Sequence, residues 1–91
     1  MANAQAVAVL HFSFTGRNGT GTVSVPGLQV GDVLSLYDSS WNPIVYSNVP
    51  FLGTAGGSTI GSVDTADTLH QQYTTDYSAT TFHLLVSRLI P

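Results

Sequence analysis

The chain has 91 residues, 8% of them charged, with a formal net charge of -3 and no cysteine. This length fits a single β domain over residues 1–91, and the lack of cysteine excludes disulfides and thiolate metal ligands. Two arginines without any lysine cannot neutralise the several phosphates on which nucleic-acid affinity rests, so we exclude nucleic acid as a partner.

The N-terminal residues 1–5 include no basic side chain, and the apolar run that begins at Ala6 is short. Signal peptides begin with a basic segment, and a membrane-spanning helix needs about 20 apolar residues. We therefore expect no signal peptide and no membrane span, and we expect synthesis in a cytoplasm.

The first predicted strand covers residues 4–14, where apolar side chains occupy both faces. Asn18 and Gly19 follow it, and this pair favours a two-residue hairpin turn in which both residues take positive φ. A hairpin centred on this turn brings residues 20–25 back alongside the first strand. It predicts four core residues on one face: Phe12, Phe14, Val23 and Val25.

Residues 33–37 form the next predicted strand, because apolar and polar side chains alternate along it. The following turn, residues 38–43, is rich in Asp, Ser and Asn, which favour turns, and it presents Trp41 at its tip. Residues 44–47 then form a short strand, and the glycine-rich residues 53–62 form a loop.

The only helix candidate lies within residues 64–77. Asp64 can cap a first helical turn, and Leu69 and Tyr73 are spaced to meet on one helix face. We expect at most one short helix near residues 64–73.

The last predicted strand, residues 80–90, is apolar on both faces, as the first one is. A strand of this kind is either central in a sandwich or covered by another subunit. Together these elements predict an all-β fold, an antiparallel β-sandwich or small β-barrel of about six to eight strands.

Candidate catalytic and metal-binding residues form no recognised pattern. The glycine-rich residues 16–21 lack the helix and lysine of a phosphate-binding loop, and no nucleophile-elbow sequence occurs. His11, His70 and His83 lack the close spacing of zinc ligands, although His11 and His83 face each other if the terminal strands pair. We therefore predict a chain that is not an enzyme, with no catalytic residue, no metal and no cofactor.

Three aspartates gather in residues 64–76: Asp64, Asp67 and Asp76. Oxygen-rich loops can bind calcium, but these residues lack the alternate-position spacing of an EF-hand loop. The pattern favours a solvated loop or a helix cap and leaves calcium binding open.

Residues 21–38 (GTVSVPGLQVGDVLSLYD) and 80–89 (TTFHLLVSRL) resemble small structural proteins of tailed bacteriophages, of the capsid-decoration or head-fibre class. Such proteins are short, free of cysteine and poor in lysine, and they commonly form trimers or other symmetric assemblies on the virion surface. The resemblance implies a viral structural protein of the virion, without catalytic residues, that contacts itself and capsid or other virion proteins.

The composition independently favours a homo-oligomer. The terminal strands are apolar on both faces, few charges solvate the surface, and neither disulfide nor obvious metal site stabilises the domain. The candidate interface residues are Val7, Val9, Leu85 and Leu89, and the phage resemblance favours a trimer.

The alternative function is a carbohydrate- or receptor-binding β module, such as the tip of a phage fibre or a lectin-like domain. Trp41 and Tyr46 are the candidate residues for stacking on a sugar. For Trp41, packing back onto the sandwich is an equally open possibility.

Overall fold

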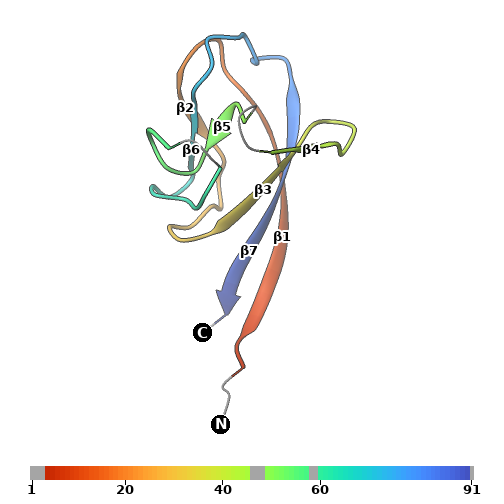
Figure 1. Cartoon of the computed structure of the whole chain (residues 1–91), viewed down its shortest axis with the longest axis vertical. Helices are drawn as coiled ribbons and strands as arrows, with labels where there is room; N and C mark the ends of the chain where they lie inside the picture. Colours follow the sequence, from red (N-terminus) through yellow and green to blue (C-terminus); the bar gives the residue numbers. More distant parts are fainter. Residues whose placement is uncertain (1–3, 46–48, 58–59, 91) are drawn as a thin grey trace.

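The computed structural model describes residues 4–45, 49–57 and 60–90. These residues form seven strands in two antiparallel sheets, and none of them is helical (Figure 1). The fold is a small β-sandwich rather than a closed barrel, so the predicted fold class is confirmed.

The first sheet has the strand order β1-β7-β3-β4. Its strands are β1 (Ala6–Thr15), β7 (Thr81–Ile90), β3 (Val33–Tyr37) and β4 (Pro43–Ile44). The second sheet has the order β2-β6-β5 and consists of β2 (Gly21–Ser24), β6 (Thr68–Gln71) and β5 (Phe51–Leu52).

The terminal strands β1 and β7 pair along their whole length, from Ala6 with Ile90 to Thr15 with Thr81. On its other edge β7 pairs with β3, but only from Ser87 to His83. The outer ends of β1 and β7 therefore continue beyond β3 as a two-stranded ribbon, which projects from the lower part of the molecule in Figure 1.

The core lies between the two sheets and takes side chains from both. Phe14 stacks on Phe82 with ring centroids 5.7 Å apart, and Phe51 meets these rings edge-on at 5.0 and 4.8 Å. Such pairs contribute beyond the area they bury. The buried apolar residues are Phe14, Val23, Val25, Leu28, Leu34, Leu36, Val49, Phe51, Leu52, Val63, Leu69, Phe82, Leu84 and Val86.

The predicted hairpin at Asn18 and Gly19 is wrong. β1 pairs with β7 and β2 pairs with β6, so the residues between β1 and β2 cross from one sheet to the other. Gly19 does have a positive φ of 88°, whereas Asn18 forms an isolated bridge with Asp76. β1 is an edge strand that pairs with β7 alone, and β2 takes its backbone partners from β6 in the other sheet.

The core residues predicted from that hairpin are nevertheless mostly right. Phe14, Val23 and Val25 are buried, and Phe12 is partly buried against the core. Alternation predicts these residues correctly because it identifies the buried face of each strand. That face points into the same core whether the two strands pair in a hairpin or lie in two facing sheets.

The helix candidate near residues 64–73 forms no helix, which agrees with the expectation of at most one. Thr68–Gln71 is the central strand β6 of the second sheet and pairs with β2 on one side and β5 on the other. Leu69 and Gln71 are buried while their neighbours are partly exposed, which is the two-residue period of a strand. Pairing on both edges satisfies the backbone of this segment, whereas one helical turn would leave most of its polar groups unpaired.

Candidate functional site: the outer face of the four-stranded sheet

The second sheet packs on one side of the four-stranded sheet, and we call the opposite side the outer face. It carries the alternate residues that do not point into the core. They are Val7, Val9, His11, Ser13 and Thr15 of β1, Val33, Ser35 and Tyr37 of β3, and Thr81, His83, Leu85, Ser87 and Leu89 of β7.

One end of the outer face is apolar. Val7 pairs with Leu89, and Val9 and Val33 pair with Ser87 from opposite sides, so the four apolar side chains gather around Ser87. All four are exposed, Val9 most of all at 67%. We call Val7, Val9, Val33 and Leu89 the apolar end.

The candidate interface residues predicted from the sequence all lie on this face. Val7, Val9 and Leu89 belong to the exposed apolar end, while Leu85 is half-buried between His11 and Ser35 on the neighbouring strands. The sequence analysis did not name Val33 as an interface residue. Its position next to the buried Leu34 in an alternating strand could have assigned it to the outer face.

The other end of the outer face carries a cluster of rings that we call the His-Trp cluster: His11, Ser13, Tyr37, Trp41 and His83. His11 Nε2 lies 2.9 Å from His83 Nδ1, and Ser13 Oγ lies 3.4 and 3.3 Å from the same two nitrogens. Trp41 stacks flat on His83, with centroids 4.1 Å apart and planes at 7°. The terminal strands therefore do bring the two histidines face to face.

The β3–β4 turn places Trp41 in this cluster. Trp41 has a φ of 63°, a left-handed conformation that is strained for a bulky residue. Asp38 holds the turn, because its Oδ1 accepts hydrogen bonds from the backbone N–H groups of Ser40 and Asn42, and its carbonyl accepts one from Trp41 N. The hydrogen bond from the Asn42 backbone is the main reason why the pKa of Asp38 lies below its usual value.

Trp41 is neither a core residue nor a fully free one. Its ring packs back onto the outer face of the sandwich and stays 46% exposed. The second candidate for sugar stacking, Tyr46, lies outside the described residues.

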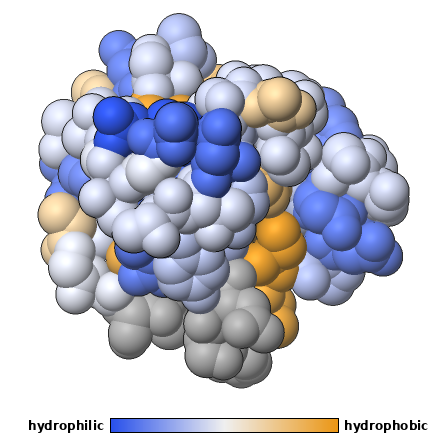
Figure 2. All heavy atoms as spheres, turned by 90° about the horizontal axis from the view of Figure 1, so that it is seen from above, coloured by the Kyte–Doolittle hydropathy of each residue, from blue (hydrophilic) through white to orange (hydrophobic). Residues whose placement is uncertain are grey.

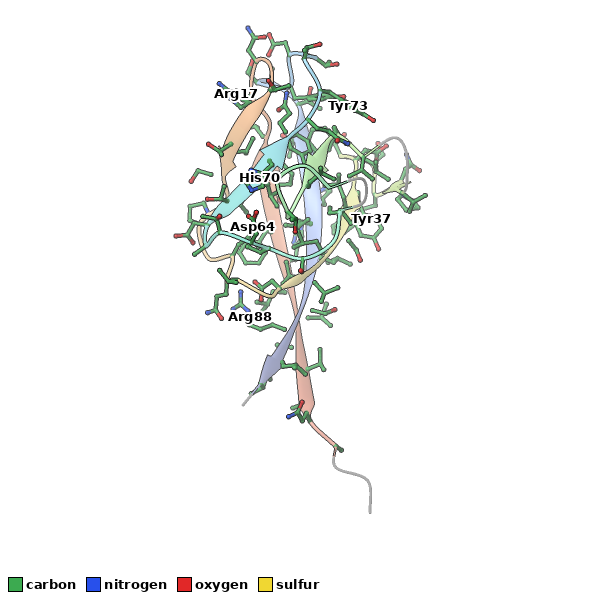
Figure 3. The ribbon with its side chains drawn as sticks, turned by 60° about the vertical axis from the view of Figure 1, so that its left-hand side comes forward. Arg17, Tyr37, Asp64, His70, Tyr73 and Arg88 are labelled. Atoms are coloured by element: carbon green, nitrogen blue, oxygen red, sulfur yellow. The ribbon has the colours of Figure 1, made fainter. Side chains whose placement is uncertain are left out.

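The three aspartates predicted to gather in residues 64–76 each bind a different partner. Asp64 Oδ1 lies 2.8 Å from His70 Nε2, and the two side chains point toward each other beside β6 in Figure 3. The hydrogen bond from His70 lowers the pKa of Asp64. Asp67 accepts a hydrogen bond from Gly27 N, and Asp76 accepts two from Ser78. Within residues 4–45, 49–57 and 60–90, no three metal-binding side chains of the His, Cys, Asp or Glu type come together.

A shallow crevice of about 280 Å³ lies beside the β3–β4 hairpin. Figure 2 shows hydrophobic atoms reaching the surface between the hydrophilic lobe of this hairpin, on the right, and the rest of the molecule. The described residues that line it are mostly apolar, with Leu36, Ile44 and Ile60 among them, and their polar side chains are those of Ser35 and Tyr37. These two hydroxyls form no acid–base pair, so the described lining contains no catalytic constellation.

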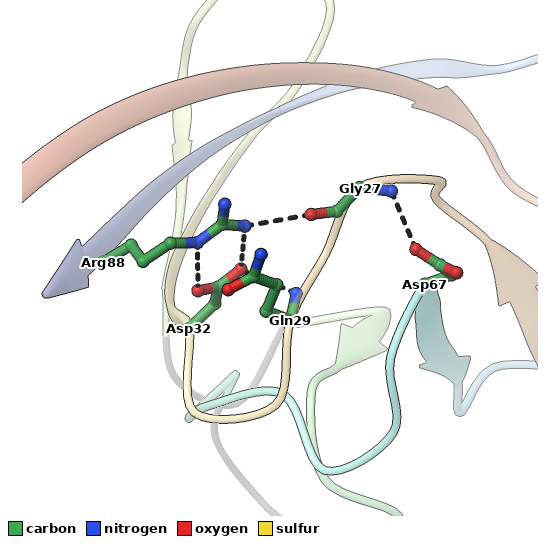
Figure 4. Close-up of polar contacts among 5 residues, drawn as sticks. All are labelled: Gly27, Gln29, Asp32, Asp67 and Arg88. Atoms are coloured by element: carbon green, nitrogen blue, oxygen red, sulfur yellow. Dashed lines mark hydrogen bonds and ion pairs between the residues drawn. The ribbon is translucent and has the colours of Figure 1, made fainter. Parts of the chain in front are cut away.

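An ion pair that the sequence analysis missed lies at the base of the sandwich. Arg88 donates from Nε and Nη2 to the two carboxylate oxygens of Asp32, and from Nη2 also to the Gly27 carbonyl (Figure 4). The hydrogen bond from Arg88 lowers the pKa of Asp32, against the opposing effect of burial. The signal available in the sequence was Arg88 on the otherwise apolar face of the last strand.

No family model, curated protein or solved structure matches this chain. Among the residues with described structure, no helix has the length and apolar character needed to cross a membrane.

Proposed function

We propose that the chain is a non-enzymatic structural protein of a virion, a capsid-decoration or head/tail-associated component that acts through contacts between identical copies. The observation that carries the self-association is the apolar end of the outer face. Four large aliphatic side chains gather around Ser87 there, and each is more than half exposed. Exposed clusters of this kind typically mark interaction surfaces.

The charge distribution supports a second copy as the occupant. None of the outer-face residues of β1, β3 and β7 is Asp, Glu, Lys or Arg, although the chain has a net charge of -3. Two copies can therefore bring these faces together without placing like charges opposite each other. Charge depletion at the centre is typical of protein interfaces.

The size of the molecule is compatible with such an interface. An obligate interface buries about 2,000 Å² in total, or roughly 1,000 Å² on each chain. The chain exposes 5368 Å², so one interface would take about a fifth of a copy's surface, and the two interfaces of each copy in a trimer would take about two fifths. A three-fold arrangement is favoured by the phage resemblance alone.

Sedimentation equilibrium of the wild type and of Val9→Asp at micromolar concentration tests the self-association. We expect a trimer for the wild type and a mass of one chain for Val9→Asp, because a carboxylate in a dry interface loses its hydration. Val45→Asp is the matched control, since Val45 is similarly exposed at 59% but follows β4, at the opposite edge of the sheet from β1. A wild-type mass of one chain would overturn the proposal.

The virion assignment has a test of its own. We expect the genes next to the coding sequence to encode capsid, portal or tail proteins, and we expect the protein in purified particles by mass spectrometry. A neighbourhood of metabolic genes, with no protein in the particles, would contradict the virion role and leave the self-association standing.

The second candidate function is carbohydrate or receptor binding through Trp41, and its exposure at a turn favours it. Against it, the polar groups around this ring already bind one another. Asn42 Nδ2 donates to Asp38 Oδ2, and the other carboxylate oxygen accepts two backbone hydrogen bonds. One ring face is also occupied by His83. These contacts leave fewer groups for sugar hydroxyls.

A glycan array with the wild type and Trp41→Ala separates the two functions. Reproducible binding that disappears in Trp41→Ala supports the carbohydrate-binding module. No binding by the wild type, together with a stable oligomer, supports the structural role.

A further inference from the structure

We propose that His11 and His83 form a binding site for a transition-metal ion, with copper(II) bound most tightly. The two imidazoles come from the first and last strands, 72 residues apart, and their Nε2 and Nδ1 atoms converge to 2.9 Å on the outer face. Imidazole nitrogen is a preferred ligand of copper, nickel and zinc. His70 is different, because its Nε2 already contacts the Asp64 carboxylate.

The spacing of the two nitrogens matches two neighbouring ligands of one ion. With metal–nitrogen bonds of about 2.0 to 2.1 Å, ligands at a right angle lie about 2.9 Å apart, and tetrahedral ligands lie about 3.3 Å apart. The observed 2.9 Å is the length of the hydrogen bond between the metal-free rings, and it brings both nitrogens within reach of one ion without selecting a metal. Copper(II) is favoured because it has the highest affinity for such nitrogen ligands among the divalent first-row metals. Ser13 Oγ, at 3.3 and 3.4 Å from the nitrogens, can hydrogen-bond a water molecule on the ion.

Binding of the ion requires a change of tautomer in one ring and no further reactant. In the metal-free pair one imidazole donates its N–H to the lone pair of the other. When the ion binds, both facing nitrogens offer lone pairs, and each ring keeps one proton on its far nitrogen. One ring changes tautomer, and the neutral pair releases no net proton.

The site is held in shape on one side and open on the other. Trp41 stacks on His83 and limits the rotation of that ring, which is the orienting role that outer groups play at metal sites. His11 and Ser13 are exposed, so an ion can reach the pair from solvent. The remaining coordination positions are open to water or to an outside ligand.

This site does not depend on the proposed self-association. His11 lies two residues along β1 from Val9, or about 7 Å in an extended strand, so the two sites are neighbours but share no residue. The copper titration is therefore also made with Val9→Asp, in which the proposed self-association is absent, and the same saturable quenching is expected there.

Trp41 is the only tryptophan in the chain, and it stacks on one of the two ligands. Bound copper(II) quenches a nearby indole, so its fluorescence reports occupancy of this site. We expect copper(II) chloride, added to the whole chain at about pH 7.5, to quench Trp41 in a saturable way at one ion per chain. The electron paramagnetic resonance spectrum should show splitting from nitrogen ligands.

His11→Asn removes one ligand from an exposed position and leaves His83, on which Trp41 stacks, in place. Because the His11 ring also lies 5.0 Å from the Trp41 ring, each titration is normalised to the metal-free fluorescence of the same variant. We expect the copper concentration for half-quenching to rise about tenfold or more in this variant. His70→Asn is the matched control and should titrate like the wild type. Equal titration of the wild type and His11→Asn, or quenching that never saturates, would overturn the proposal.

Discussion

Asp32 and Arg88 form a two-bond ion pair, with Nε to Oδ1 at 2.8 Å and Nη2 to Oδ2 at 2.6 Å. It ties the turn between β2 and β3 to the end of β7, where β3 no longer pairs with that strand. The Asp32 carboxylate is buried and also accepts a hydrogen bond from Gln29 N. The pair therefore fixes the base of the projecting ribbon to the sandwich.

Asp32→Asn should lower the free energy of unfolding by about 1 to 3 kcal/mol, because a buried acceptor of charge-assisted hydrogen bonds is lost. Urea denaturation measures the change. Asp76→Asn is the control, since the hydrogen bonds described for this exposed carboxylate come from Ser78 and its loss should cost less. Equal losses in the two variants would contradict a structural role for the ion pair.

The same pair predicts a dependence of stability on pH. Arg88 holds the pKa of Asp32 below 3.8 in the folded chain. Its contribution is therefore fully present above that value and disappears as the pH falls through the lower folded pKa. We expect the stability difference between the wild type and Asp32→Asn to be large at about pH 7 and to shrink below pH 3.8. If urea titrations gave the same stability difference at about pH 7 and below pH 3.8, the proposed contribution of the ion pair would be refuted.

Phe82→Ala should cost about 3 to 5 kcal/mol, because it removes a buried ring that contacts both Phe14 and Phe51. Phe12→Ala should cost less, about 1 to 2 kcal/mol, since Phe12 is only partly buried and already contacts solvent. Thermal and urea unfolding of both variants test the order. A greater loss for Phe12→Ala would mean that the β1 edge is more enclosed than its exposure indicates.

Gln71→Leu should destabilise the fold by about 1 to 3 kcal/mol, because it removes the part-buried hydrogen bonds between the buried Gln71 amide and the backbone. Gln71 Oε1 accepts from Arg17 N, and Nε2 donates to the carbonyls of Arg17, Tyr73 and Thr75 at 3.0 Å each. Gln29→Leu, at an exposed position, should leave urea denaturation almost unchanged. Similar midpoints for the two variants would show that water replaces the lost hydrogen bonds.

Local alternation in the sequence was enough for the strands that follow a two-residue period. Val33–Tyr37 and the two long terminal strands appear close to their predicted ranges, because one face of each is buried and the pattern records it. The two-faced apolar strands likewise pointed to strands that are central in a sandwich or covered by another subunit.

The pairing of these strands was beyond the reach of local patterns. Asn18 and Gly19 form a good hairpin signal, yet β1 gains ten pairs with β7, which lies at the other end of the chain. The segment Thr68–Gln71 has weak helical spacing, yet two neighbouring strands supply its backbone partners. In both cases contacts between distant segments outweigh a small local preference.

The candidate sites divide in the same way. Composition and periodicity identify Val7, Val9 and Leu89 as surplus apolar residues, because a face that repeats every second residue is visible in one strand alone. The approach of His11 to His83, the stack of Trp41 on His83 and the burial of Asp32 against Arg88 depend on β7 lying between β1 and β3. This strand order depends on which of the long apolar strands pair and bury one another, and it is visible only in the folded chain.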